Sequence, residues 1–189
     1  MNRTVLLQQQ QSVPEKSVPV GPDLFWSPAE LSGITNGNID GIRANWPLIA
    51  NAMAARGIWD RDNAAAVAAT VAIETAHTFE PVREAFWLDE AWRQNNLRYW
   101  PFYGRGFVQL TWESNYKAAG DALGFDFVNH PDLAMDPMMA AMILAWFWET
   151  HFLPQFARRH DWREVRRRVQ GGSDGLDELI AYASGLLAL

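Results

Sequence analysis

Apolar residues recur at helical spacing along much of the chain. Between Ile39 and Arg56 they occupy positions 42, 46, 49, 50 and 53, which are three or four residues apart, and Gly57 follows as a stop signal. Upstream, Ser27 precedes Pro28, the usual order of an N-cap and a first helical position. The pattern predicts amphipathic helices that begin near Pro28 and near Ile39.

The segment Asn63–His77 is rich in alanine and apolar on nearly all sides, which predicts a helix buried on most faces. It contains one carboxylate, Glu74. Strand-like alternation is scarce, and Phe107–Thr111 is the one candidate for a short strand. The fold class is therefore expected to be mainly α, with at most a small β-hairpin. Three further segments have helical periodicity: Asn115–Leu123, Pro137–His151 and Asp161–Val169.

The first 22 residues differ in composition from the rest. They combine a glutamine run with prolines at positions 14, 19 and 22, which predicts a flexible arm before a single domain over residues 23–189. The apolar stretch Val5–Leu7 is too short for a signal peptide, so we expect synthesis in the cytoplasm. No apolar run approaches the roughly 18 residues of a membrane span, so stable membrane insertion is not expected.

Composition narrows the candidate chemistry. The chain has no cysteine, which excludes disulfides, a thiolate zinc site and a cysteine nucleophile. Its four histidines, at positions 77, 130, 151 and 160, show no paired spacing, so neither a metal nor another cofactor is expected. A net charge of -6 argues against a nucleic-acid partner. The arginines at 158, 159, 163, 166, 167 and 168 are interpreted as a solvated helix face or as a surface for an anionic wall polymer.

Glu74 is the first candidate catalytic residue. A carboxyl among Val71, Ala72 and Ile73 loses hydration on ionising, which favours its protonated form. A general acid for glycosidic cleavage needs such a proton, because the leaving oxygen must be protonated as the bond breaks. The alternative is a carboxylate at an exposed helix end that pairs with Arg83 or His77.

A second carboxylate is needed to activate water, and Glu84 is the candidate. In one continuous helix Glu84 would lie about 15 Å from Glu74, beyond the roughly 6.5–9.5 Å of an inverting pair. Pro81 forbids that helix, so a chain that ends near His77 and turns can bring Glu84 across a cleft from Glu74. The same reasoning leaves three alternatives for the base: Glu80, Asp89 and Glu90.

The run Tyr103–Thr111, which reads YGRGFVQLT and is followed by Asn115-Tyr116, resembles the signature of glycoside hydrolase family 19, the chitinases and related phage and bacterial endolysins. Glu74 and Glu84 precede it in the family's order. The segment Asn129–Ala134 and the pair Gly171-Gly172 resemble further family segments. The resemblance covers roughly residues 25 to 175.

This resemblance implies a lysozyme-like, two-lobed helical fold with a central substrate cleft. It assigns the general acid to Glu74, the general base to Glu84 and the hydroxyl that holds the attacking water to Thr111. It also implies that three polar residues line the cleft and bind sugar: Tyr103, Gln109 and Asn115.

Tryptophan is abundant, with ten in the chain. Aromatic faces pack against the apolar faces of pyranose rings, so Trp100 and Trp112, which flank the signature, are expected to contact sugar. Most of the other tryptophans are expected in the core.

The expected reaction is the inverting hydrolysis of β-1,4 bonds between amino sugars. Chitin and peptidoglycan share this linkage. The lack of cysteine and of a signal, with the short spacing between Glu84 and Tyr103, favours a monomeric peptidoglycan-degrading endolysin that acts on the cell wall after release. The alternatives are a chitinase and, secondly, a non-catalytic wall-binding or phage structural protein.

Overall fold

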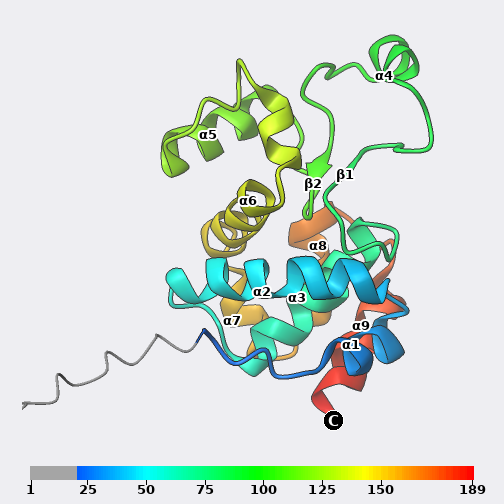
Figure 1. Ribbon diagram of the computed structural model, residues 1–189, viewed down its shortest axis with the longest axis vertical. Coiled ribbons are helices and arrows are strands. Elements are labelled where there is room, and N and C mark those ends of the chain that lie inside the picture. The colour runs from blue at the N-terminus through cyan, green and yellow to red at the C-terminus, as the bar shows by residue number, and fades with distance from the viewer. Residues whose placement is uncertain (1–20) are drawn as a thin grey trace, which may run out of the picture.

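The computed structural model describes residues 21–189, so the predicted arm over residues 1–22 lies almost wholly outside the described residues. The described chain is mainly helical, as predicted (Figure 1). Its elements are α1 (Pro28–Thr35), α2 (Ile39–Ala55), α3 (Arg61–Glu74), β1 (Val82–Arg83), α4 (Glu90–Asn96), β2 (Arg105–Gly106), α5 (Glu113–Leu123), η1 (Pro131–Met135), α6 (Pro137–Thr150), α7 (Leu153–Ala157), α8 (Trp162–Gln170) and α9 (Leu176–Leu187).

The first two helices begin where the sequence predicts. At α1 the Ser27 hydroxyl accepts a hydrogen bond from the Glu30 amide, while the Glu30 carboxylate accepts one from the Ser27 amide, so a capping box forms. At α2 the side chain of Asn38 accepts from the amides of Asp40 and Gly41. These bonds satisfy amides that have no partner inside the helix.

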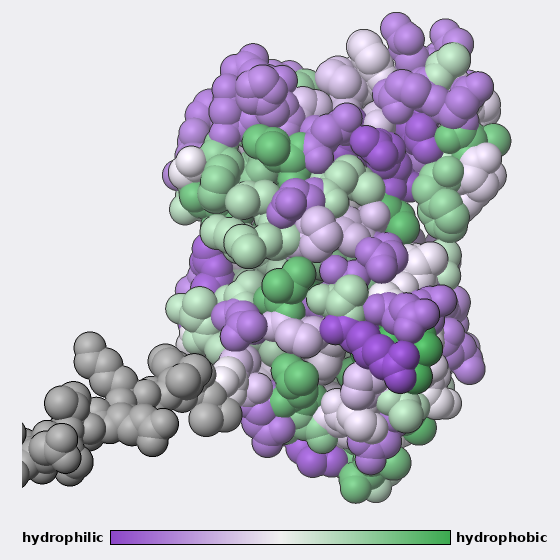
Figure 2. Space-filling model, viewed as in Figure 1, coloured by the Kyte–Doolittle hydropathy of each residue, from purple (hydrophilic) through white to green (hydrophobic). Residues whose placement is uncertain are grey.

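The helices form two parts that meet at α6. Figure 1 shows α1, α2, α3, α7, α8 and α9 in the lower part and α4, α5 and the strands in the upper part. Helix α3 is the centre of the lower part, since every residue from Asn63 to Ala72 is buried, and α9 packs against it. Hydrophilic side chains cover α4 and α5, whereas paler and more hydrophobic residues surround α6 (Figure 2).

Helix α3 ends at Glu74, three residues before the predicted end at His77. The chain then turns sharply, because Ala76, His77 and Phe79 adopt left-handed φ values of 48°, 63° and 54°. The Thr75 hydroxyl stabilises the turn by donating to the Val71 carbonyl and accepting from the Phe79 amide. Glu74 is therefore the last residue of α3, immediately before the turn.

This turn over residues 75–79 is docked on α2. The Asn38 amide donates to the carbonyl of His77 at 2.7 Å, and the Asn45 side chain donates to the carbonyl of Phe79 at 2.8 Å. Gly41 faces the turn so closely that an added Cβ would lie 2.0 Å from the Thr78 carbonyl oxygen. The backbone of α2 thus fixes where the chain leaves α3.

The predicted strand over Phe107–Thr111 is wrong. The short antiparallel sheet pairs β1 with β2, with Val82 opposite Gly106 and Arg83 opposite Arg105. Beyond β2 the chain turns back, since Gln109 has a φ of 52°, and Leu110 forms only an isolated bridge to Arg105. The sheet is small, as expected, but its strand within the signature is Arg105–Gly106, just before the predicted segment.

The C-terminal helix α9 was not predicted from the sequence. Its buried residues Leu179, Tyr182, Ala183 and Leu186 have the helical spacing that indicates such an element. They pack on α3, so α9 completes the lower core. Among residues 21–189, no helix has the length and apolar character needed to cross a bilayer.

Replacing Gly41 by alanine is expected to destabilise the protein by about 1–3 kcal/mol, because the new methyl group overlaps the Thr78 carbonyl and the α2 backbone must shift. Urea unfolding measures this change. Gly33→Ala in α1 is the matched control, since nothing lies within 4 Å of its added Cβ, and it should be neutral or slightly stabilising. Equal stability of the two variants would show that the close approach is not real.

Candidate active site

Six of the residues predicted for the site line one groove of about 710 Å³: Glu74, Glu84, Gln109, Thr111, Trp112 and Asn115. A second hollow of about 300 Å³ is also lined by Glu74, Glu84 and Gln109. We call these the larger and the smaller hollow. Since they share three residues, they form one cleft with the two carboxylates at the junction.

Glu74 closes α3 with its side chain only 13% exposed, and it forms an ion pair with Arg166 of α8, whose side chain is 5% exposed. The sequence predicted a carboxyl among apolar residues; the side chain is largely buried, but it is not alone there, because it has a charged partner. The partner is neither Arg83 nor His77, which contact Asp132 and Glu178 respectively. The Arg166 guanidinium contacts Oε1 of Glu74, and within residues 21–189 Oε2 accepts no hydrogen bond.

The sequence contains a signal for the position of Arg166. Trp162, Val165 and Val169 recur at helical spacing, and Arg166 falls on the same side of α8. Its guanidinium also donates to the Asp174 carbonyl. Because it is buried and paired, Arg166 does not belong to a solvated face.

The other arginines of the cluster are dispersed. Arg167 and Arg168 both pair with Glu164, and Arg158 pairs with Asp60. Arg168 also lines the larger hollow. The cluster is thus divided between buried, paired and cleft positions.

Glu84 follows β1 and is held by four hydrogen bonds. Its carboxylate accepts hydrogen bonds from the Tyr99 hydroxyl at 2.6 Å and from the Gly104 amide at 2.9 Å. Its own amide donates to the Gly104 carbonyl at 2.7 Å, and the buried Arg93 guanidinium donates to its carbonyl at 2.8 Å. The carboxylate therefore has one fixed orientation in the cleft.

Gly104 allows this arrangement because it has no side chain. An added Cβ would lie 2.7 Å from the Gln109 side-chain oxygen and 3.3 Å from a carboxylate oxygen of Glu84. Gly104, the first glycine of the signature, thus lets the backbone approach both side chains.

Tyr99 was not identified from the sequence, because no spacing rule connects it to Glu84. Burial and the hydrogen bond to Glu84 raise the pKa of Tyr99 to about 12, so the phenol remains a donor at neutral pH. Its ring packs against that of Trp112, with the centroids 4.8 Å apart. Tyr99 therefore joins the carboxylate to the aromatic wall of the larger hollow.

The polar residues of the signature form a chain of hydrogen bonds along the larger hollow. The Thr111 hydroxyl donates to the Gln109 carbonyl at 2.8 Å, and the Asn115 amide donates to the Thr111 carbonyl at 2.8 Å. The side-chain amide of Gln109 donates to the carbonyls of Val82 and Gly106, so it also braces β1 against β2.

The structure does not bring Tyr103 and Trp100 into the cleft. Tyr103 is buried, and its hydroxyl donates to Glu90 at 2.8 Å, while the Trp100 indole donates to the other oxygen of Glu90 at 2.9 Å. Neither residue lines the larger or the smaller hollow. Both instead attach the chain just before β2 to Glu90, the first residue of α4.

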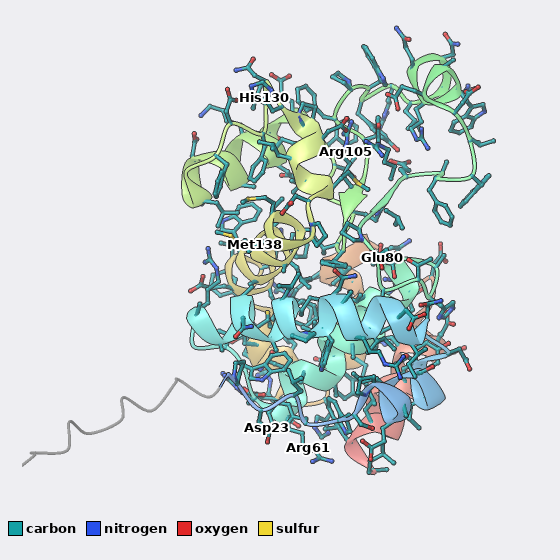
Figure 3. All side chains as sticks on the ribbon, viewed as in Figure 1. Asp23, Arg61, Glu80, Arg105, His130 and Met138 are labelled. Carbon is teal, nitrogen blue, oxygen red and sulfur yellow. The ribbon has the colours of Figure 1, made fainter. Side chains whose placement is uncertain are left out.

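The alternative bases are also placed elsewhere. Glu90 binds Tyr103 and Trp100, and Asp89 caps α4 by accepting from the Trp92 amide. Glu80 is exposed on the chain that approaches β1 (Figure 3). None of the three lines either hollow with Glu74. Glu84 is thus the predicted base that shares the cleft with the predicted acid.

Arg105, at the centre of the signature, is a brace and not a cleft residue. Its buried guanidinium donates to Asp132, to the Pro101 carbonyl and to the Tyr116 hydroxyl, within the upper part of the molecule (Figure 3). In the described part of the chain, no three histidine, aspartate or glutamate side chains are arranged to hold a metal ion.

A family model of class I chitinases matches residues 60–161, which is more than half of the chain. Chitinase 11 of Oryza sativa subsp. japonica is 54% identical over 56 residues, which are 29% of this chain and 22% of that protein. The acidic 27 kDa endochitinase of Solanum lycopersicum is 49% identical over 59 residues, 31% of this chain and 24% of that protein. These matches thus cover only about a quarter of each relative.

Two solved structures have a similar fold. Chitinase C from Streptomyces griseus HUT6037 aligns with a TM-score of 0.59 and 22% identity, over 87% of this chain and 76% of that chain. A bacterial family 19 chitinase aligns with a TM-score of 0.53 and 25% identity, over 88% and 89%. The expected lysozyme-like helical fold is confirmed. With the signature and the family match, these findings show that the chain belongs to the class I chitinase family, glycoside hydrolase family 19.

Proposed function

We propose that this protein is an inverting glycosidase that hydrolyses β-1,4 bonds between N-acetylglucosamine units of a chitin-type polymer. The observation that carries the proposal is the position of Glu74 and Glu84, which come from separate elements and line the same cleft. Inverting glycosidases need two carboxyl groups on opposite sides of the bond, with room for water between them.

Glu74 acts as the general acid. Arg166 contacts Oε1, which leaves Oε2 available to carry the proton toward the leaving oxygen of the sugar. A protonated carboxyl can keep accepting from Arg166 through its carbonyl oxygen while its hydroxyl donates. Arg166 therefore orients the acid without occupying the oxygen that transfers the proton.

Glu84 acts as the general base. Tyr99 and the Gly104 amide each donate to one of its oxygens, and donors of this kind stabilise a carboxylate charge. The ionised group takes a proton from water as that water attacks the anomeric carbon from the face opposite the leaving group. We assign the binding of this water to the Thr111 hydroxyl, because Thr111 lines the same hollow and a hydroxyl oxygen can accept a hydrogen bond from water.

The relatives favour chitin over peptidoglycan as the polymer. The matched plant proteins are named as chitinases or endochitinases, so chitin takes the place of the peptidoglycan first expected from the sequence. One matched relative is named an inactive chitinase-like protein. The proposal of activity therefore rests on the carboxylate pair and its donors, and not on family membership alone.

Peptidoglycan is the second candidate, because it has the same linkage between amino sugars. The observation that favours it is the presence of the Arg168 guanidinium in the larger hollow. Peptidoglycan carries carboxylates on its lactyl-peptide branches, whereas chitin is uncharged, so a cationic group in the cleft fits the branched polymer better.

Incubation with colloidal chitin and, in parallel, with purified sacculi is expected to release new reducing ends from chitin, identified by mass spectrometry. Glu74→Gln should lower this rate by at least about a hundredfold, because glutamine cannot donate the proton, while binding and folding are retained. Glu80→Gln is the matched control, since Glu80 is exposed and outside the cleft, and it should keep full activity.

Undiminished hydrolysis by the Glu74→Gln protein would contradict the acid assignment. Release of fragments from sacculi alone would replace chitin by peptidoglycan as the substrate. Release from neither polymer by the folded protein would contradict the proposal of a glycosidase.

Tyr99→Phe is expected to lower kcat by about tenfold, because the hydrogen bond that orients the carboxylate of the base is lost. Steady-state kinetics on a soluble oligosaccharide measure this loss.

Tyr182→Phe provides the control for this substitution. The Tyr182 hydroxyl likewise donates to a carboxylate, that of Glu178, but it lies on α9 outside the cleft. Its removal should leave kcat unchanged. A kcat that is the same in both variants and in the unaltered protein would show that Tyr99 does not act on the base.

A further inference from the structure

Two aromatic side chains, Phe86 and Trp87, follow closely after the base in the sequence. Trp87 is 72% exposed and Phe86 is 45% exposed, although tryptophan and phenylalanine are usually the anchors of a core. Their rings meet edge to face with centroids 5.2 Å apart. We call this pair the aromatic platform. Adjacent exposed aromatic side chains beside a cleft are typical of a binding site.

The platform lies on the wall of the cleft. Phe86 and Trp87 line the smaller hollow together with Glu74 and Glu84. Trp112 lines the larger hollow, which shares the two carboxylates, and is 43% exposed. Each of the two hollows that meet at the carboxylates is therefore lined by an exposed tryptophan.

The polar groups of the smaller hollow complement the platform. Arg83, Gln109 and Arg166 line it as well, and Arg83 keeps 37% of its side chain exposed beside its contact with Asp132. An apolar wall with a few hydrogen-bonding groups is the usual composition of a ligand site. Pyranose rings fit this chemistry, because they present apolar C–H faces and a rim of hydroxyl and amide groups.

We propose that Phe86 and Trp87 bind one sugar ring of the polymer on the side of the carboxylates opposite Trp112, so that the chain is held on both sides of the scissile bond. This inference rests on the proposed function, since the occupant is the polymer that the cleft cuts. The continuity of the two hollows through Glu74, Glu84 and Gln109 identifies that occupant, because a chain bound in one hollow runs directly into the other.

Binding of an N-acetylglucosamine hexasaccharide to the Glu74→Gln protein, measured by isothermal titration calorimetry, tests the platform without hydrolysis. Adding Trp87→Ala should weaken the affinity by about tenfold, because the stacking surface is removed. Adding Trp87→Tyr should restore most of the affinity, since an aromatic face remains. Circular dichroism verifies that each variant is folded.

Trp92→Ala is the matched control. Trp92 is also an exposed tryptophan, at 37%, and lies on α4, but it lines neither hollow. Its replacement should leave the affinity unchanged. Equal affinity of the Trp87→Ala protein and its Glu74→Gln parent, or an equal loss in the Trp92→Ala protein, would overturn the platform while the proposed function stands. A folded Glu74→Gln protein that binds no hexasaccharide would overturn both.

Discussion

The end of α3 is the constraint on which the cleft depends. A helix that continued past Glu74 would carry the chain away from this proposed acid, but three left-handed residues between positions 76 and 79 reverse its direction. Left-handed backbone costs free energy for residues with a side chain, so this turn needs compensation. The start of α2 supplies it through Asn38, Asn45 and the close approach of Gly41.

From that turn the chain enters β1, and Glu84 is the residue that follows this strand. The pairing of Val82 with Gly106 brings Gly104 beside the carboxylate, so the same short sheet that joins distant segments also supplies a donor to the proposed base. The proposed acid and the proposed base thus belong to different parts of the structure, one at the end of a buried helix and one after a braced strand. Their separation is set by backbone packing rather than by contact between them.

Local patterns were enough to predict much of this arrangement. Helical periodicity and capping residues gave most helices, and Pro81 correctly indicated that Glu74 and Glu84 do not share a helix. What the sequence could not give are contacts between residues far apart. Arg166 is 92 residues from Glu74, and Tyr99 meets Glu84 only because α4 and the strands fold back. Tyr103 matches the signature, but its side chain is buried and its hydroxyl donates to Glu90, so it does not line the cleft.

If Glu84 activates a water that attacks opposite the leaving group, hydrolysis inverts the configuration at the anomeric carbon. Proton NMR of a chitin oligosaccharide during the first minutes of hydrolysis detects this inversion, because it shows which anomer is formed before mutarotation. A base and an acid separated by water predict that the α-anomer appears first from the β-linked substrate. Initial release of the β-anomer would mean a retaining reaction and would exclude Glu84 as the base of an inverting one.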